Sequence, residues 1–334
     1  MRSIKIGHAR VGDGEPTYII AEIGLNHDGD IIQAKQLIEA ATHAGADAVK
    51  FQVFRAAELC SKKSEQFSLF ESLELSTDEW AELAAVAADR EIPFMASVFG
   101  NKSADILEMI EAPSYKIASG DLTYWSLLRY VAAKRKPMIL STGMATVGEI
   151  DEALRQIYDT GNREVALLHC VSAYPPTFSE LNLRAIQTLK TAFGVPIGFS
   201  DHTLRSIASV AAVAMGANLI EKHLTLDPNR AGPDHKLSLG PSDFAEMIQD
   251  LRLVESSQGN GYKTATTAEL EVKKFARRSV SAKTEIQKGS IITTDSIEIV
   301  RPADGIAPRF AFLVIGRAAK RTIAEGESIA WKDI

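Results

Sequence analysis

The sequence predicts an α/β protein, a (β/α)8 TIM barrel followed by a small β-rich domain. Short β-rich runs alternate with helix-like segments at a steady spacing, which is typical of parallel βα units. Eight such runs precede residue 224, and eight is the number that closes this barrel. After about residue 260 the pattern changes. The eight runs cover residues 17–23, 46–52, 92–97, 114–118, 137–141, 165–170, 195–200 and 217–223.

Segments between these runs have helical periodicity. Within residues 31–44, apolar side chains recur every three or four positions, with Asp30 as a plausible cap and Gly45 as a stop. Residues 76–90 begin with a Ser-Thr-Asp-Glu run suited to a helix N-terminus, and residues 146–158 begin with a capping-box pattern. We therefore expect helices over these three segments.

The C-terminal part of the chain differs in composition from the rest. Residues 259–279 are rich in Gly, Thr, Lys and Arg. Two similar phrases follow, Ile-Gln-Lys-Gly at 286–289 and Ile-Ala-Glu-Gly at 323–326, which suggest short strands and turns. A domain of about 55 residues is marginal alone, so we expect it to pack on something else. We predict a catalytic barrel over residues 1–260, a linker over 261–280 and a small domain over 281–334.

Composition excludes several classes of protein. The formal net charge of −6 argues against non-specific nucleic-acid binding. Cys60 and Cys170 are too few for a disulfide framework, which fits a reducing cytoplasm. The N-terminus lacks an apolar signal core and no run of about 18 apolar residues occurs. We expect a cytoplasmic protein with no nucleic-acid or membrane partner.

Almost every predicted strand ends in a polar residue. Reacting groups of such barrels lie at the C-terminal ends of the strands, so these positions are candidate site residues. A single serine there is more often a helix cap or a buried hydrogen-bonding group, but a complete ring is hard to explain in that way. The ring consists of Glu22, Lys50, Ser97, Lys116 with Ser119, Ser141, Ser172 with Tyr174, Ser200 with His202, and Glu221 with His223.

Two lysines in this ring follow runs that should be buried on both faces. Burying the ammonium of Lys50 or Lys116 costs several kcal/mol unless an anion is close. One interpretation pairs each lysine with a barrel carboxylate such as Glu22 or Glu221. The other, which we favour, is that the two lysines and several hydroxyls bind a phosphate and a carboxylate of a substrate.

His202 and His223 end the last two predicted strands, so their imidazoles should lie side by side. A lone histidine is more often structural. Two histidines on neighbouring strand ends, with Glu22 across the mouth and Glu221 and Asp234 nearby, predict a site for a divalent transition ion.

At these segments the sequence resembles the sialic acid synthase family, which includes N-acetylneuraminate, legionaminate and pseudaminate synthases. The resemblance spans essentially the whole chain, and the family's second domain, called SAF or antifreeze-like, matches the repeats after residue 281. Several specific strings occur in the right order. They are Ala-Glu-Ile-Gly-Leu-Asn-His (21–27), Gly-Ala-Asp-Ala-Val-Lys-Phe-Gln (45–52), Tyr-Lys-Ile-Ala-Ser-Gly (115–120), Ser-Thr-Gly-Met (141–144), Gly-Phe-Ser-Asp-His-Thr (198–203) and Glu-Lys-His-Leu-Thr-Leu-Asp (221–227).

The resemblance implies a role for each residue. His202 and His223 match the ligands of a divalent metal, Mn or Mg, that receives the aldehyde oxygen of an open-chain sugar. Glu22 matches the acidic residue close to the reacting carbons. Positions near phosphoenolpyruvate are matched by Lys50, Ser97, Lys116, Ser119, Ser172 and Ser200. Positions that bind or orient the sugar are matched by Tyr174, Glu221, Asp234 and Arg301.

The implied reaction joins C3 of phosphoenolpyruvate to the aldehyde carbon of an N-acetylmannosamine-like sugar and releases phosphate. Glu22, Lys50 and Lys116 are the expected catalytic residues. The resemblance also implies a homodimer with exchanged C-terminal domains, in which Arg301 reaches the barrel of the other subunit. Its position beside Pro302, in a small domain after a flexible-looking linker, fits this arrangement.

The chain departs from some N-acetylneuraminate synthases in two strings. It has Ser172 where they have Asn, and Asp121 where they have Glu. The second position bears on the sugar, so a legionaminate or pseudaminate synthase using a 2,4-diacetamido-trideoxyhexose is the alternative. A Schiff-base aldolase with a lysine nucleophile and a non-catalytic sugar-binding protein are more distant alternatives.

Overall fold

The computed structural model describes residues 3–334 and divides the chain into two compact units. The first unit ends at Gly259 and the second covers Asn260–Ile334. Each unit is described by itself. The second unit begins at the residue before the predicted linker, and residues 267–276 within that linker form a helix.

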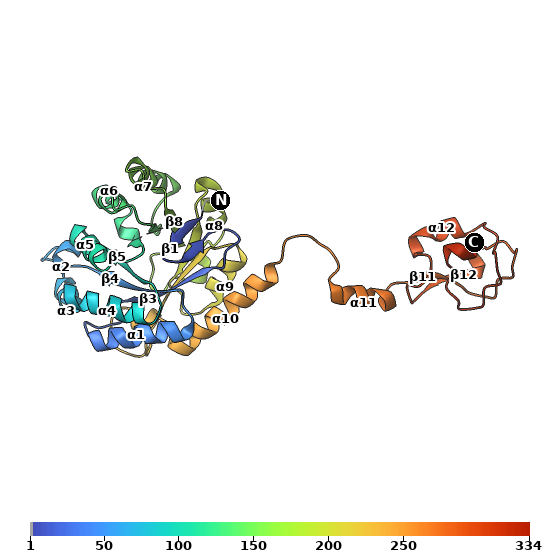
Figure 1. Ribbon diagram of the computed structural model, residues 1–334, viewed down its shortest axis with the longest axis horizontal. Coiled ribbons are helices and arrows are strands. Elements are labelled where there is room, and N and C mark those ends of the chain that lie inside the picture. The colour runs from blue at the N-terminus through green and yellow to red at the C-terminus, as the bar shows by residue number, and fades with distance from the viewer. Residues whose placement is uncertain (1–2) are drawn as a thin grey trace. The chain divides into compact units, whose positions relative to one another are not determined.

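The first unit is a closed barrel of eight parallel strands in the order β10-β3-β4-β5-β6-β7-β8-β9 (Figure 1). This confirms the predicted fold, and each of the eight predicted runs overlaps one barrel strand. Buried side chains on both faces explain why the runs are continuously apolar. The strands are β3 (Tyr18–Gly24), β4 (Ala48–Val53), β5 (Phe94–Val98), β6 (Tyr115–Ile117), β7 (Met138–Ser141), β8 (Val165–Cys170), β9 (Ile197–Asp201) and β10 (Leu219–His223).

Helices surround the barrel. The three predicted helices are present, and Ser76 and Thr146 each form a capping box with the glutamate three residues later. Asp30 caps the first helix, which ends at the left-handed Gly45. The helices are α1 (Ile31–Ala44), α2 (Ala56–Leu59), α3 (Phe67–Leu73), α4 (Thr77–Asp89), α5 (Asn101–Met109), α6 (Trp125–Ala132), α7 (Val147–Asp159), α8 (Ala185–Phe193), α9 (Ile207–Ala214) and α10 (Pro241–Gln258).

An N-terminal hairpin, which the sequence analysis did not predict, closes the bottom of the barrel. Its strands β1 (Ile4–Ile6) and β2 (Ala9–Val11) pair antiparallel. Ile4, Ile6 and Val11 are buried in one cluster with the inward-facing side chains of the barrel strands. The barrel interior is therefore sealed at this end and open only at the C-terminal ends of its strands.

The second unit has its own small core. It contains α11 (Thr267–Ala276), the antiparallel pair β11 (Ser279–Ala282) and β12 (Ile297–Val300), and the short helix α12 (Ala311–Val314). The two repeated phrases pair with each other through a bridge between Ile286 and Ile323, both buried. The repeat thus forms the centre of the small domain. By contrast, α11 buries none of its residues within this unit.

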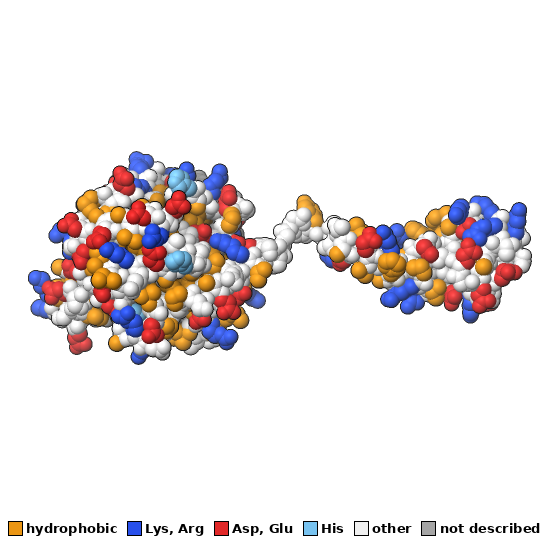
Figure 2. Space-filling view, turned by 60° about the horizontal axis from the view of Figure 1, so that its bottom comes forward, with side chains coloured by type: hydrophobic (Ala, Val, Ile, Leu, Met, Phe, Trp, Pro, Cys, Tyr) orange, Lys and Arg blue, Asp and Glu red, His pale blue; other side chains and the backbone are white. Residues whose placement is uncertain are grey.

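Charges of both signs are interspersed on the faces visible in Figure 2. Among the described residues, no helix is both long and apolar enough to cross a bilayer.

Candidate active site

Along the barrel axis, the side chains that fill the interior change from apolar to polar near the C-terminal ends of the strands. Inward-facing side chains occur at every second position of a strand. On six strands an apolar interior residue is followed, two positions later, by a reactive or polar one. The pairs are Ile20 and Glu22, Ala48 and Lys50, Met95 and Ser97, Ile139 and Ser141, Leu168 and Cys170, and Leu219 and Glu221.

These residues line a cavity at the mouth of the barrel. The cavity brings together most of the residues singled out from the sequence: Glu22, Lys50, Ser97, Lys116, Ser119, Ser141, Tyr174, Ser200, His202, Glu221 and His223. Four further wall residues were not singled out as site residues: Gln52, Phe99, Ala118 and Cys170. The alternation rule alone would have found Cys170, whereas the side chain of Gln52 contacts Glu22 in a way that only the fold reveals.

Lys50 lies between two carboxylates at the centre of this cavity. Its Nζ is 2.8 Å from Glu22 Oε2 and 3.1 Å from Glu221 Oε2. It also donates to Ser97 Oγ at 3.2 Å, while Ser200 Oγ donates to Glu221 Oε1 at 2.8 Å. For Lys50, the structure therefore supports the interpretation that pairs the lysine with barrel carboxylates.

The two carboxylates have opposite pKa shifts although they share one lysine. Burial raises the pKa of Glu22 to about 7; Lys50 opposes this shift and Glu221 adds to it. Burial would also raise the pKa of Glu221, but Lys116, Lys50 and the Ser200 hydroxyl outweigh it and lower the value to about 2. Near neutral pH, Glu221 is therefore ionised, whereas Glu22 is present in both its protonated and its ionised form.

Lys116 has no carboxylate partner among the described residues. Its Nζ is buried and donates to the Ile117 carbonyl at 2.9 Å. Burial lowers the pKa of Lys116. The charge of Glu221 opposes this shift, but no described carboxylate forms an ion pair with Lys116, so Lys116 is the stronger candidate for binding substrate phosphate.

A cluster of small groups lies next to Lys116 on the wall. Ser119 Oγ is 3.1 Å from Cys170 Sγ and accepts from the Gly143 amide at 3.0 Å. A Cβ on Gly143 would lie only 2.2 Å from Ser172 Oγ, and that hydroxyl is buried without a hydrogen-bond partner in residues 3–334. Ser172 therefore lies beside the expected phosphoenolpyruvate site with a free hydrogen-bonding group, although it does not line the cavity.

The two histidines lie side by side, with ring centroids 5.7 Å apart. His202 Nδ1 is 3.0 Å from the Val171 carbonyl, which can only accept, so Nδ1 carries the proton and Nε2 has the lone pair. Burial lowers the pKa of His202, and burial with the charges of His202 and Lys50 lowers that of His223 far below its usual range. Both imidazoles are neutral at pH 7, the form that binds metals.

Asp234 lies at the rim of the site. Its Oδ2 is 4.0 Å from His223 Nδ1, a buried atom with no hydrogen-bond partner in the described chain. It accepts from the Leu25 amide at 3.1 Å. A Cβ on Gly24 would lie 2.8 Å from this oxygen, so the backbone must approach Asp234 closely here.

Arg301 belongs to the second unit, and the structure does not bring it together with the other candidates. Its side chain is exposed and makes no hydrogen bond or ion pair with the described residues. Its role stays a prediction.

A larger cavity, of about 600 Å³, lies at the opposite end of the barrel, where the strands begin. Its charged groups are already paired: Lys190 with Asp13 at 2.7 Å, and Arg252 with Asp47 and Glu255 at 3.0 Å each. It offers no free charge to a ligand, so we place the chemistry at the mouth of the barrel.

The mouth of this TIM barrel holds a buried lysine without an ion-pair partner, two carboxyl groups with opposite pKa shifts, and two neutral imidazoles. Such a set of groups is typical of an enzyme that acts on an anionic substrate. Comparison with known proteins defines the family. The model of the NeuB family matches residues 37–263, and the model of the SAF domain matches residues 277–334. The chain therefore belongs to the NeuB family.

Relatives cover nearly the whole chain. The N,N'-diacetyllegionaminic acid synthase of Campylobacter jejuni is 40% identical over 94% of this chain and 98% of its own. The human N-acetylneuraminate-9-phosphate synthase is 34% identical, over 96% and 93%. The crystal structure of an N-acetylneuraminic acid synthetase from Leptospira borgpetersenii, in complex with citrate, is similar with a TM-score of 0.78 and 34% identity, covering 81% of this chain and 95% of that one.

Proposed function

We propose that this enzyme condenses phosphoenolpyruvate with an N-acetylmannosamine-like aldehyde sugar and releases phosphate, giving a nine-carbon 2-keto sugar acid. The observation that carries the proposal is Lys116, a buried ammonium without a carboxylate partner that lies at the same mouth as the Glu22–Lys50–Glu221 cluster. The two relatives reported above, named as an N,N'-diacetyllegionaminic acid synthase and an N-acetylneuraminate-9-phosphate synthase, support it.

In the reaction, C3 of phosphoenolpyruvate forms a bond to the aldehyde carbon of the sugar. Water then adds at C2, and the bond between C2 and the phosphate oxygen breaks. Glu22, with a pKa of about 7, can accept the proton that this water loses. Lys50 holds Glu22 in place through their ion pair, and the ionised Glu221 can balance the positive charge that develops at C2.

We further propose that His202 and His223 bind a divalent ion, Mn or Mg. Their neutral imidazoles and the unpartnered Nδ1 of His223 fit this use. No group of three or more His, Cys, Asp or Glu residues in the described chain could enclose an ion, so the remaining positions would be left to water and the sugar. When bound, the ion would polarise the aldehyde carbonyl.

The identity of the sugar decides between two activities. The C. jejuni relative is named as a diacetyllegionaminic acid synthase, which favours a 2,4-diacetamido-trideoxyhexose as the alternative acceptor. Phosphate release from phosphoenolpyruvate should be measured with this sugar and with N-acetylmannosamine. Release with N-acetylmannosamine supports the main proposal, release only with the other sugar supports the alternative, and release with neither contradicts both.

The lowered pKa of Lys116 is also what a Schiff-base aldolase would require. Borohydride reduction in the presence of a keto acid distinguishes the two chemistries. Our proposal expects an unmodified protein, whereas an aldolase would give a covalent adduct on Lys116.

We propose that the enzyme works as a homodimer with exchanged C-terminal domains, in the cytoplasm. The exposed, unpartnered Arg301 and the wholly exposed α11 are features that a second subunit would explain. Both cysteines are free thiols, which fits a reducing compartment.

A further inference from the structure

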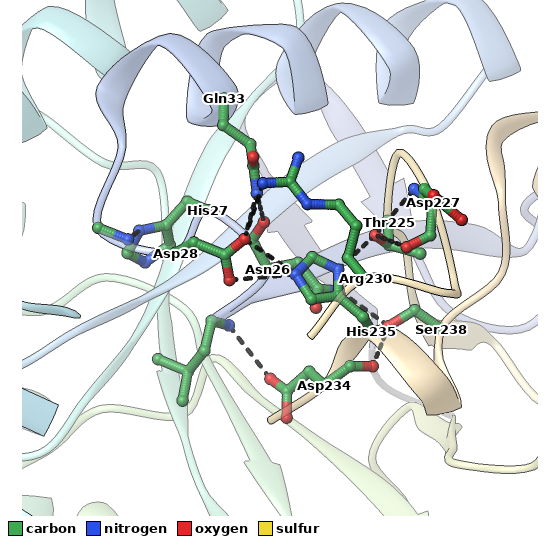
Figure 3. Close-up of polar contacts among 12 residues, drawn as sticks. Asn26, His27, Asp28, Gln33, Thr225, Asp227, Arg230, Asp234, His235 and Ser238 are labelled. Carbon is green, nitrogen blue, oxygen red and sulfur yellow. Dashed lines mark hydrogen bonds and ion pairs between the residues drawn. The ribbon is translucent and has the colours of Figure 1, made fainter. Parts of the chain in front are cut away.

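A buried hydrogen-bond network joins two segments that lie about 200 residues apart in the chain. The first is residues 25–30, between β3 and α1; the second is residues 224–240, between β10 and α10. Figure 3 shows the labelled residues of both segments meeting around His235. Because the second segment carries Asp234, whatever fixes this segment also fixes one rim of the site.

His235 is at the centre of the network and is only 1% exposed. Its Nε2 is 3.0 Å from Asp28 Oδ1 and 3.1 Å from Oδ2, and its Nδ1 is 2.6 Å from Thr225 Oγ1. Since a carboxylate only accepts, Nε2 donates to Asp28. The imidazole is therefore held at both ends, by the first segment and by the start of the second.

Other contacts tie the same two segments together. Asn26 Nδ2 donates to the Leu224 carbonyl at 2.9 Å and to Ser238 Oγ at 2.8 Å, and Ser238 Oγ donates to the Asp234 carbonyl at 2.6 Å. Asp28 is also 3.3 Å from Arg230 Nη2. A Cβ on Gly232 would lie 2.5 Å from His235 Cδ2, so the chain passes directly over the imidazole.

A hydroxyl, an imidazole and a carboxylate in a row also occur in nucleophilic triads. That reading does not fit here. Thr225 is completely buried and belongs to none of the cavity walls described above, so no substrate can reach its hydroxyl. The buried Thr225 hydroxyl and His235 imidazole are therefore not in contact with a substrate, and an effect of His235 on the reaction must pass through another residue.

That residue is Asp234, next to His235 in the chain. As Figure 3 shows, the two side chains point in different directions, His235 into the network and Asp234 toward the backbone amide of the first segment. We infer that His235 is a positioning residue, which locks residues 224–240 onto residues 25–30 and so holds the Asp234 carboxylate beside His223 for sugar binding. This inference rests on the proposed function, because the sugar-binding role of Asp234 is what the family resemblance implies for that reaction.

The kinetic test separates the two substrates. His235→Ala should raise KM for the sugar about tenfold or more, with little change in KM for phosphoenolpyruvate, because Lys116 and Ser119 lie outside the network. His235→Gln keeps a donor in reach of Asp28 and should recover part of the loss. Equal changes in both KM values would overturn the inference.

A double-mutant cycle tests whether His235 acts through its neighbour. Adding His235→Ala to an Asp234→Ala variant should raise KM for the sugar no further, since the carboxylate to be positioned is gone. Fully additive effects would mean that His235 contributes independently of Asp234, and the positioning role would be wrong.

Hydrogen exchange gives a readout that needs no substrate. In His235→Ala, the amides of residues 224–240 should exchange faster while those of the barrel strands keep their protection. Gly232→Ala crowds the imidazole but keeps every polar group, and it should also speed up exchange of the amides of residues 224–240. Unchanged exchange in both variants would overturn the inference.

Asn162→Ala is the matched control. Asn162 is also buried and bonds three loop groups, at the Lys136 and Ala132 carbonyls and the Glu164 amide, but near the other end of the barrel. The Asn162→Ala variant should leave both KM values unchanged, and the amide hydrogen exchange of residues 224–240 as well. If the unaltered enzyme turns over no sugar, the proposed function fails, and the exchange measurement still decides whether His235 anchors this segment.

Discussion

Lys50 and Lys116 occupy equivalent positions, yet their surroundings give them different properties. Lys50 is neutralised by Glu22 and Glu221, and these carboxylates outweigh burial and raise its pKa. Lys116 is left with a backbone carbonyl, and burial lowers its pKa. We therefore assign the positioning of Glu22 and Glu221 to Lys50, and capture of the substrate phosphate to Lys116.

Replacement of Lys116 should weaken phosphoenolpyruvate binding selectively. Lys116→Ala removes a charge-assisted contact in a partly dry pocket, which is worth about 2–3 kcal/mol. Calorimetric titration should show this loss, and Lys136→Ala, which removes a lysine paired with Glu108 on the outside of the barrel, should show none. Unchanged affinity in Lys116→Ala would remove this residue from the site.

The raised pKa of Glu22 predicts a pH dependence near neutrality. The carboxylate that accepts a proton is populated only above its pKa, so kcat should rise with pH and level off above about 7. Glu22→Gln should lower kcat and remove this rise. Asp121, whose pKa burial raises to about 6, is the alternative source; Asp121→Asn should keep the rise if Glu22 is responsible.

At the scale of elements, the neighbouring strands β9 and β10 bring the two histidines together. Their register places Ser200 opposite Glu221 and Asp201 opposite Lys222. Asp201 and Lys222 form a buried ion pair with a 3.0 Å separation, on residues directly before the two histidines. The strand ends that carry the imidazoles are thus joined by a charged contact as well as by backbone hydrogen bonds.

The paired histidines predict a dependence on divalent metal. A chelator should abolish phosphate release, and Mn or Mg should restore it. Direct Mn binding to the metal-free protein should be lost in His202→Ala and His223→Ala, but kept in a His169→Ala control, because His169 bonds the Leu181 carbonyl instead. Full activity of metal-free protein would contradict the proposed mechanism.

The barrel and most of its mouth could be predicted because both follow from local patterns. Strands buried on both faces give largely apolar runs, and charged residues such as Glu22 or Lys50 within them stand out. The N-terminal hairpin has only three residues in each strand, too few to show a period. The helix α11 has a capping box of Thr266 and Glu269, but the Gly, Thr and Lys residues before it suggested a linker.

The His235 network could not be predicted for a different reason. Asp28 and His235 lie in irregular segments whose meeting depends on the closure of β10 onto β3. Neither sequence period nor strand position indicates which loop side chains will touch. The same holds for Gln52, whose amide is 3.4 Å from Glu22 Oε1 on the neighbouring strand.

For the whole molecule, the proposed exchange of C-terminal domains in a dimer makes Arg301 a test of which subunit completes the site. A His202→Ala chain should have an inactive barrel but an intact Arg301. An Arg301→Ala chain should have an intact barrel but lack the arginine. Unfolded and refolded together, the two inactive chains should regenerate one working site in each mixed dimer. Impairment of Arg301→Ala without any recovery in the mixture would mean that the arginine acts within its own chain.

The anchoring of residues 224–240 has a consequence for how such enzymes diversify. The residues that we propose bind phosphoenolpyruvate lie mainly on the barrel strands or directly after them, whereas Asp234 is on a segment held by Asn26, Asp28 and His235. A lineage can therefore acquire a new acceptor sugar by altering the tip of this segment, while the condensation machinery is inherited unchanged. Grafting the corresponding segment of a relative with a different acceptor, with these three anchors kept, is the direct route to exchanging sugar preference in the laboratory.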